Sequence, residues 1–189
     1  MFFLHGRSPI LLEAKVNARW SLDSVHDQFA VGRRFRILNI VDDVTREGLA
    51  AIPDTSISGK RVARKLTGLI GTSGKPGMIV SDNGTEFTSN AKLGWAKDHR
   101  VEWHDIAPGR STDNAFIESF NGKFRSECLN AHWFMSLDDA QQKCEAWRRD
   151  YSEERPHSAI GNKTPIDVMS RSAAHGPPLV EQAGNSAAA

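Results

Sequence analysis

Three strand-like segments joined by short linkers set the strongest limit on how this chain can fold. Residues 20–29 mix apolar and polar side chains as a half-buried strand does, residues 34–41 follow a turn at Gly32, and residues 48–52 form a third run. The linkers are too short to cross over to a parallel neighbour. The sequence therefore predicts an antiparallel three-stranded meander.

The hydrophobic period changes after this meander. Apolar residues recur at helical spacing from Ser58, and the glycine-containing segment 71–77 ends that helix. A short apolar run at 78–80, a helix at 90–99 and a strand-like run at 101–106 are expected to follow. Strands and helices thus alternate in this part of the chain.

Two further helices are expected after the last strand. The first begins near Thr112 or Asp113, either of which can cap it, and runs to about Leu129. The second runs from a cap at Ser136 to about Tyr151. The core stripe of the first is predicted to be Phe116, Phe120 and Phe124, with Ile117 beside it. The whole order predicts an α/β fold, with a mixed sheet that carries helices on its faces.

Length and composition indicate one globular domain. The chain has 189 residues, of which 39% are apolar and 25% charged. No stretch approaches the roughly 20 apolar residues that span a bilayer, and Met1–Leu4 is too short for a signal peptide. A cytoplasmic protein with no membrane contact is therefore expected. Residues 171–189 are rich in Ala, Ser, Gly and Pro and are predicted to be a disordered tail.

The charge balance alone does not indicate a nucleic-acid partner, because 24 Lys and Arg face 23 Asp and Glu. Residues 58–77 nevertheless carry five basic side chains and no acidic one: Lys60, Arg61, Arg64, Lys65 and Lys75. They either face a phosphate backbone or form a solvated helix face. The sequence has no Gly-x-Ser-x-Gly elbow and no phosphate-binding Gly-rich loop with its Lys, which leaves serine-hydrolase and nucleotide-hydrolase functions without support.

Three carboxylates stand at positions that suit a metal site. Asp23 lies in the middle of the first strand, Asp82 follows the apolar run 78–80, and Glu118 lies on the helix that begins near Asp113. Three convergent carboxylates fit a two-magnesium site. The alternative is structural: Asp82 makes an Asx turn, Glu118 pairs with Arg125, and Asp23 forms a salt bridge.

A family resemblance favours the metal site. The segments Ser81–Phe87, Ile106–Gly109 and Asn114–Gly122 resemble the catalytic core of bacterial insertion-sequence transposases, which are similar to retroviral integrases of the DDE type. In this family 35 residues separate the second aspartate from the glutamate, and 35 residues lie between Asp82 and Glu118. Segments 38–47 and 150–158 extend the resemblance to about residues 20–169.

The resemblance implies a ribonuclease-H-like fold, with a mixed five-stranded sheet and helices on both faces. It implies an N-terminal extension at 1–19, an integrase catalytic core at 20–170 and a tail at 171–189. Asp23, Asp82 and Glu118 would be both the catalytic residues and the ligands of two Mg²⁺ or Mn²⁺ ions. The implied reactions are hydrolysis of a phosphodiester at the element's end and transfer of the freed 3′-hydroxyl to a second DNA strand.

The same resemblance implies DNA as partner, both element ends and target, together with a homo-oligomer and a nucleoid-associated bacterial protein. The expected DNA-binding residues are Arg125, Lys123, Asn114 and Asn121, although structural capping explains the two asparagines equally well. Trp20, Trp103 and Trp133 either stack on bases or lie in the core. Asp42 and Asp43 are expected to end a strand and start a turn.

Two departures from the family pattern leave other functions open. Ser24 follows Asp23 where the family usually has a bulky apolar residue, and nothing in residues 1–19 resembles the helix-turn-helix that members carry upstream or obtain from a separate reading frame. The second hypothesis is therefore a truncated, inactive remnant that binds DNA or a full-length transposase. The third is a ribonuclease-H-type nuclease.

Overall fold

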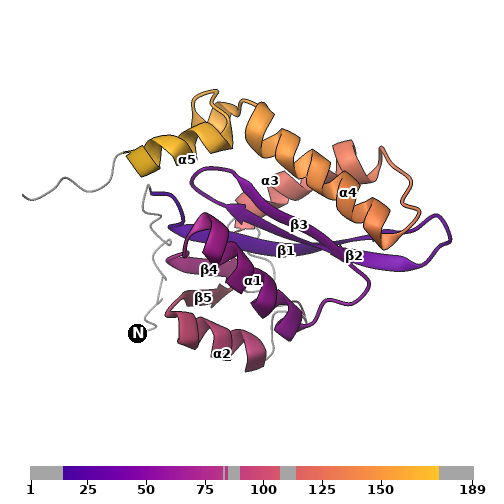
Figure 1. The fold of residues 1–189 in the computed structure, drawn as a ribbon, viewed down its shortest axis with the longest axis horizontal. Helices are drawn as coiled ribbons and strands as arrows, with labels where there is room; N and C mark the ends of the chain where they lie inside the picture. Colours follow the sequence, from indigo (N-terminus) through magenta and orange to yellow (C-terminus); the bar gives the residue numbers. More distant parts are fainter. Residues whose placement is uncertain (1–14, 83, 85–89, 107–113, 175–189) are drawn as a thin grey trace, which may run out of the picture.

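The computed structural model describes residues 15–82, 84, 90–106 and 114–174. Within them a five-stranded sheet has the order β3-β2-β1-β4-β5 (Figure 1). The strands are β1 (Arg19–Gln28), β2 (Arg34–Asp42), β3 (Gly48–Asp54), β4 (Met78–Ser81) and β5 (Glu102–Asp105). Strands β1 to β3 form the predicted antiparallel meander, while β4 pairs in parallel with β1 and β5 pairs in parallel with β4. The mixed sheet expected from the sequence is confirmed.

Helices cover both faces of this sheet (Figure 1). On one face lie α1 (Gly59–Ser73) and α2 (Asn90–His99). On the other lie α3 (Ala115–Phe124) and α4 (Leu137–Arg149), each continued by a π-helical turn, η2 (Arg125–Leu129) and η3 (Asp150–Glu154). A short 3-10 turn η4 (Ser158–Ile160) and α5 (Pro165–Ala174) follow. No helix in these described parts is long and apolar enough to cross a membrane.

Alternation along the central strands divides the core into two clusters. Leu22 and Ile40 point to the cluster under α1 and α2, whereas Val25 and Ile37 point to the cluster under α3 and α4. Because successive strand residues point to opposite faces, Asp23 shares the face of Val25. The sequence pattern of β1 therefore directs Asp23 toward α3.

Two expectations need correction. Phe116 is only half-buried, and the buried stripe of α3 is Ile117, Phe120 and Phe124. The Arg46 guanidinium lies 3.6 Å from the Phe116 ring centroid, so this ring serves as a platform for a cation at the edge of the core. The predicted tail also starts too early, since residues 171–174 belong to α5.

The predicted helix caps have mixed outcomes. Ser136 caps α4 as predicted, by accepting a bond from the amide of Asp139. Ser58, from which the helical spacing was expected, also caps its helix, by accepting a bond from the amide of Arg61. The predicted caps Thr112 and Asp113 lie outside the described residues.

Gly48 gives a direct test of the packing between β3 and α3. A Cβ on Gly48 would lie 2.7 Å from Cε2 of Phe120, a fully buried ring. We expect Gly48→Ala to lower the free energy of unfolding by about 1–3 kcal/mol, as overpacked cores do. Gly68→Ala is the matched control, because nothing lies within 4 Å of its Cβ and alanine favours helix α1. Urea denaturation of both variants measures the two free energies of unfolding. A wild-type free energy of unfolding in G48A would contradict the prediction.

Candidate active site

Asp23 lies half-buried in the central strand β1, opposite Asn39 of β2. Its Oδ1 accepts a 2.7 Å hydrogen bond from the backbone amide of Ser24, and its Oδ2 accepts one of 2.7 Å from Nδ2 of Asn121 on α3. These donors stabilise the negative charge that the sequence placed among apolar neighbours. The carboxylate is therefore held in one orientation at the junction of sheet and helix.

Asp82 lies one residue beyond the end of β4 and is exposed. Leu22 of β1 pairs in parallel register with Ser81, so the next positions along the two adjacent strands are Asp23 and Asp82. Parallel neighbours are about 4.8 Å apart, which brings these two backbones close together. The Oδ1 of Asp82 accepts a 3.0 Å bond from the amide of Gly84, which is the Asx turn considered as its structural role.

Glu118 lies in the first turn of α3 and is exposed. Residues three apart on a helix share a face, and Asn121 on that face reaches Asp23. Glu118 is thus one helical turn from a direct contact with the first carboxylate. In the described part of the chain, Glu118 and Arg125 form no ion pair with each other, so the structural alternative for Glu118 is not seen.

The carboxylates do not form a ready-made metal cage. Among the described residues no three His, Cys, Asp or Glu side chains gather closely enough to hold a metal ion. The fold brings Asp23 and Asp82 to neighbouring strand positions and Glu118 to the adjoining helix, but the side-chain oxygens of the three are not converged. That these three carboxylates bind metal ions together stays a prediction.

The four predicted DNA-binding residues have different surroundings. Lys123 and Arg125 are exposed, and Nζ of Lys123 lies 5.7 Å from the Tyr151 ring centroid. Asn114 is buried at the N-cap position of α3, but its side chain makes no capping bond. Asn121 uses its amide inside the protein, with Nδ2 on Asp23 and Oδ1 on Asn39. The basic pair is therefore available to a phosphate, while Asn121 has an internal partner at each end of its amide.

Asn39 is a site residue that the sequence reasoning missed. It is fully buried, and its Nδ2 donates a 2.7 Å hydrogen bond to Oδ1 of Asn121. A signal existed, since Asn39 is the one polar residue in the apolar run 37–41.

The neighbouring pair Asp42 and Asp43 has a structural role, as predicted. Oδ1 of Asp42 accepts the amides of Val44 and Thr45, which ends β2 in a turn. Asp43 is fully buried, pairs with Arg19 and accepts a 2.8 Å bond from the Ser21 hydroxyl. Burial raises the pKa of both carboxyl groups.

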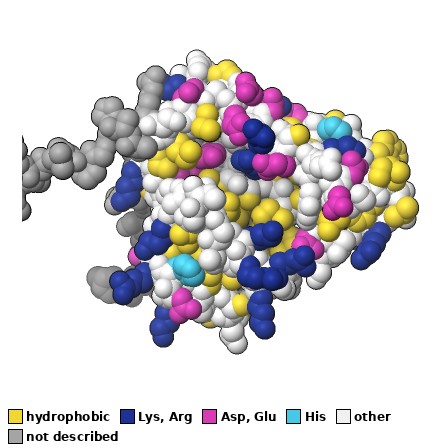
Figure 2. Space-filling view, in the orientation of Figure 1, with side chains coloured by type: hydrophobic (Ala, Val, Ile, Leu, Met, Phe, Trp, Pro, Cys, Tyr) yellow, Lys and Arg dark blue, Asp and Glu magenta, His cyan; other side chains and the backbone are white. Residues whose placement is uncertain are grey.

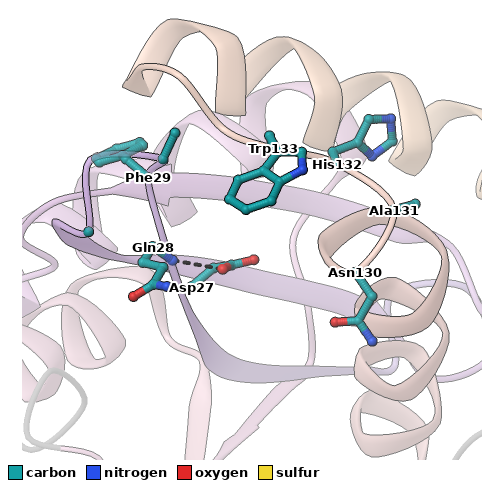
Figure 3. Close-up of a pocket in the computed structure, with 9 residues that line it drawn as sticks. Asp27, Gln28, Phe29, Asn130, Ala131, His132 and Trp133 are labelled. Atoms are coloured by element: carbon teal, nitrogen blue, oxygen red, sulfur yellow. Dashed lines mark hydrogen bonds between the residues drawn. The ribbon is translucent and has the colours of Figure 1, made fainter.

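A pocket of about 290 Å³ lies at the other end of β1, where the β1–β2 hairpin meets the segment after η2 (Figure 3). Asp27 lines it from β1, and Asn130 and Trp133 line it from the segment after η2. Trp133 is 78% exposed, whereas Trp20 is fully buried and Trp103 half-buried. Hydrophobic side chains gather on the surface at this end of the molecule (Figure 2). Of the three tryptophans considered for base stacking, Trp133 is the accessible one.

The basic residues of α1 lie on a different side of the molecule. All of them are exposed, and Figure 2 shows Lys and Arg side chains gathered over this helix. Because α1 covers the sheet face opposite to Asp23, this patch and the carboxylates do not share one surface.

Comparison with known proteins identifies the family of this chain. A model of the integrase core domain matches residues 13–111, and a second model of the same description matches residues 99–165. The chain belongs to the integrase core domain family. It is 46% identical over 159 residues to an uncharacterized 39.2 kDa protein of insertion element IS476 from Xanthomonas euvesicatoria, which covers 84% of this chain. It is 44% identical over 165 residues, 87% of this chain, to a 31.7 kDa protein of IS407 from Burkholderia multivorans.

The match covers 46% of the IS476 protein and 60% of the IS407 protein, so the chain spans about half the length of these relatives. Solved integrases have the same ribonuclease-H-like fold. The catalytic core of HTLV-2 integrase, in complex with magnesium, matches with a TM-score of 0.61 at 18% identity, over 82% of this chain and 97% of that one. The BIV integrase core matches with a TM-score of 0.64 at 16% identity, over 84% and 97%.

A simian T-cell lymphotropic virus intasome in complex with a PP2A regulatory subunit matches with a TM-score of 0.68 at 18% identity, over 95% of this chain and 63% of that one. These likenesses confirm the predicted fold. The insertion-element relatives confirm the predicted link to bacterial transposases.

Proposed function

We propose that this chain is the catalytic core of a metal-dependent DNA transposase, which hydrolyses a phosphodiester and transfers the DNA end to a second strand. The observation that carries the proposal is that Asp23 and Asp82 directly follow Leu22 and Ser81, the last register pair of two parallel strands, with Glu118 on the helix that contacts Asp23 through Asn121. The match to the integrase core domain model supports the reaction class.

Asp23, Asp82 and Glu118 would hold two Mg²⁺ or Mn²⁺ ions. Carboxylate oxygens are the ligands these ions prefer, and the magnesium complex of HTLV-2 integrase supports this choice. When bound, the ions would activate an attacking oxygen and offset charge on the phosphorus. The exposure of Asp82 and Glu118 leaves room for a DNA strand, and Arg125 and Lys123 would contact its phosphates.

The same proposal includes DNA as the partner, at both element ends and at the target, and a homo-oligomer that joins these DNA sites. The intasome among the structural neighbours supports assembly. The family resemblance also suggested, as a partner, a separate helix-turn-helix protein from an upstream reading frame. That partner has no support and is not part of the proposal.

The direct test uses purified protein with Mg²⁺ or Mn²⁺ and labelled duplexes taken from the DNA that flanks its gene. Nicking followed by joining to a second duplex is the expected result. Cleavage of an RNA–DNA hybrid without joining would instead identify a ribonuclease-H-type nuclease. If Mn²⁺ binds but no strand is cut or joined, the chain is not a transposase core on its own.

Non-enzymatic DNA binding is the second candidate function, favoured by the exposed basic face of α1. Its DNA affinity would fall steeply with salt, because phosphate contacts release counterions. Salt-independent binding would exclude this function.

Trp133 gives a test of DNA contact outside the carboxylates. We expect Trp133→Ala to weaken binding of a single-stranded oligonucleotide roughly 10-fold, since stacking of one base is worth about 1–3 kcal/mol. Met135→Ala is the matched control, because Met135 lies two residues further along the chain and is 68% exposed but has no ring. Fluorescence anisotropy of a labelled oligonucleotide measures both. Equal binding by W133A and wild type would show that Trp133 does not stack on DNA.

A further inference from the structure

Asn39 occupies a position where an amide side chain lowers the stability of the fold. It lies in the middle of β2 with no exposed surface, and its Oδ1 has no hydrogen-bond partner in the described residues. An unsatisfied buried acceptor is destabilising, and an apolar residue of similar size would avoid that cost. Packing alone therefore does not account for an asparagine here.

The other end of this amide leads to the site. Nδ2 of Asn39 donates to Oδ1 of Asn121, and Nδ2 of Asn121 donates to Oδ2 of Asp23, both at 2.7 Å. Asn39 and Asp23 are also direct register partners on β2 and β1. The two strand residues thus lie side by side, and one helix residue bridges them.

This arrangement selects the orientation of the bridging amide. The two ends of an asparagine side chain have nearly the same shape but opposite polarity. If Asn121 turned over, its Oδ1 would face the Asp23 carboxylate and repel it. The bond from Asn39 holds Oδ1 of Asn121 on the β2 side, so that Nδ2 points to Asp23. The donor in turn restricts rotation of the carboxylate.

We infer that Asn39 is a positioning residue for Asp23 and acts through Asn121. The inference rests on the proposed function, because it treats Asp23 as a metal ligand. Groups that orient a ligand are typically worth about 10–100-fold in metal affinity. Asn39 trades some folding stability for the orientation of one carboxylate.

The test is a Mn²⁺ titration of the full chain, followed by electron paramagnetic resonance, together with thermal unfolding. We expect Asn39→Leu to weaken Mn²⁺ binding roughly 10-fold or more, while its melting temperature stays equal to that of wild type or rises. A residue with a merely structural role would lower the melting temperature instead. Asn39→Val, which suits a strand, replaces the leucine variant if that one does not fold.

A double-mutant cycle tests the route through Asn121. In an Asn121→Ala background, Asn39→Leu should cause no further loss of Mn²⁺ affinity. Ile40→Val is the matched control, because this neighbour points to the opposite face of the sheet; it should lower the melting temperature and leave the affinity unchanged.

Two results would overturn the inference: wild-type Mn²⁺ affinity in N39L, or additive losses in the double variant. Asp23→Asn separates this failure from failure of the proposed function. If D23N binds Mn²⁺ as wild type does, the metal site itself is wrong. If D23N loses Mn²⁺ and N39L does not, only the role of Asn39 is wrong.

Discussion

Strand transfer is expected to fall at least about 100-fold when Asp23, Asp82 or Glu118 is replaced singly by its amide. Each substitution removes one anionic oxygen ligand, and the charge stabilisation that bound metal gives a phosphoryl transition state is worth several kcal/mol. Because Asp82 and Glu118 are exposed, D82N and E118Q should fold with unchanged melting temperatures. Gel assays of DNA joining measure the loss of strand transfer, and Mn²⁺ titration measures the accompanying loss of metal affinity.

Asp27→Asn is the matched control for these variants. Asp27 is half-buried on the same strand and the same sheet face as Asp23, four residues further along. It should keep both activity and metal affinity. Equal loss in D27N would mean that the effect comes from charge on this face in general, and normal joining by E118Q would remove Glu118 from the site.

Phe120→Ala is expected to cost about 3–5 kcal/mol of unfolding free energy, the range for a large aromatic residue truncated in a core. The Phe120 ring is fully buried and makes edge contacts with Trp147 and Tyr151 at centroid distances of 5.2 and 5.0 Å. These contacts join α3 to the opposing helical segment, so their loss creates a cavity and removes aromatic pairing.

Phe116→Ala provides the comparison on the same helix. Its ring is half-buried and its main partner is the Arg46 guanidinium, so we expect a cost of at most about 2 kcal/mol. Urea unfolding measures the loss of unfolding free energy in each variant. Equal losses would mean that both rings lie in the core, as the sequence predicted.

The sequence predicted the order of strands and helices well because strand and helix periods are local properties. The first three strands and the helix after Ser58 needed only the spacing of apolar residues and short linkers. The assignment of Phe116 to the core failed for a related reason. Phe116 and Ile117 lie about 100° apart around the helix, at opposite edges of the stripe that contains Phe120 and Phe124, and only the position of α3 against the sheet decides which edge is buried.

The candidate site was predictable in part. The spacing of Asp82 and Glu118 and the local motif at Asp23 could be read along the chain, but the link between β1 and α3 could not. Asn39 and Asn121 are 82 positions apart, and their contact exists only once the sheet and helix pack. A buried polar residue in an apolar strand signals that a partner exists without identifying it.

The central place of β1 has a consequence for local opening. Asp23 pairs with Asn39 of β2 and follows Leu22, which is paired with both β2 and β4, so the backbone around Asp23 should exchange with solvent deuterium only when the whole domain unfolds. Asp82 lies one residue past the end of β4, where fraying opens the chain at a much lower free energy. A bound metal ion that joined the two would slow exchange around Asp82 and leave the rate at Asp23 at the global limit. The proposed site therefore connects one of the most protected segments of the sheet to one of its loosest ends.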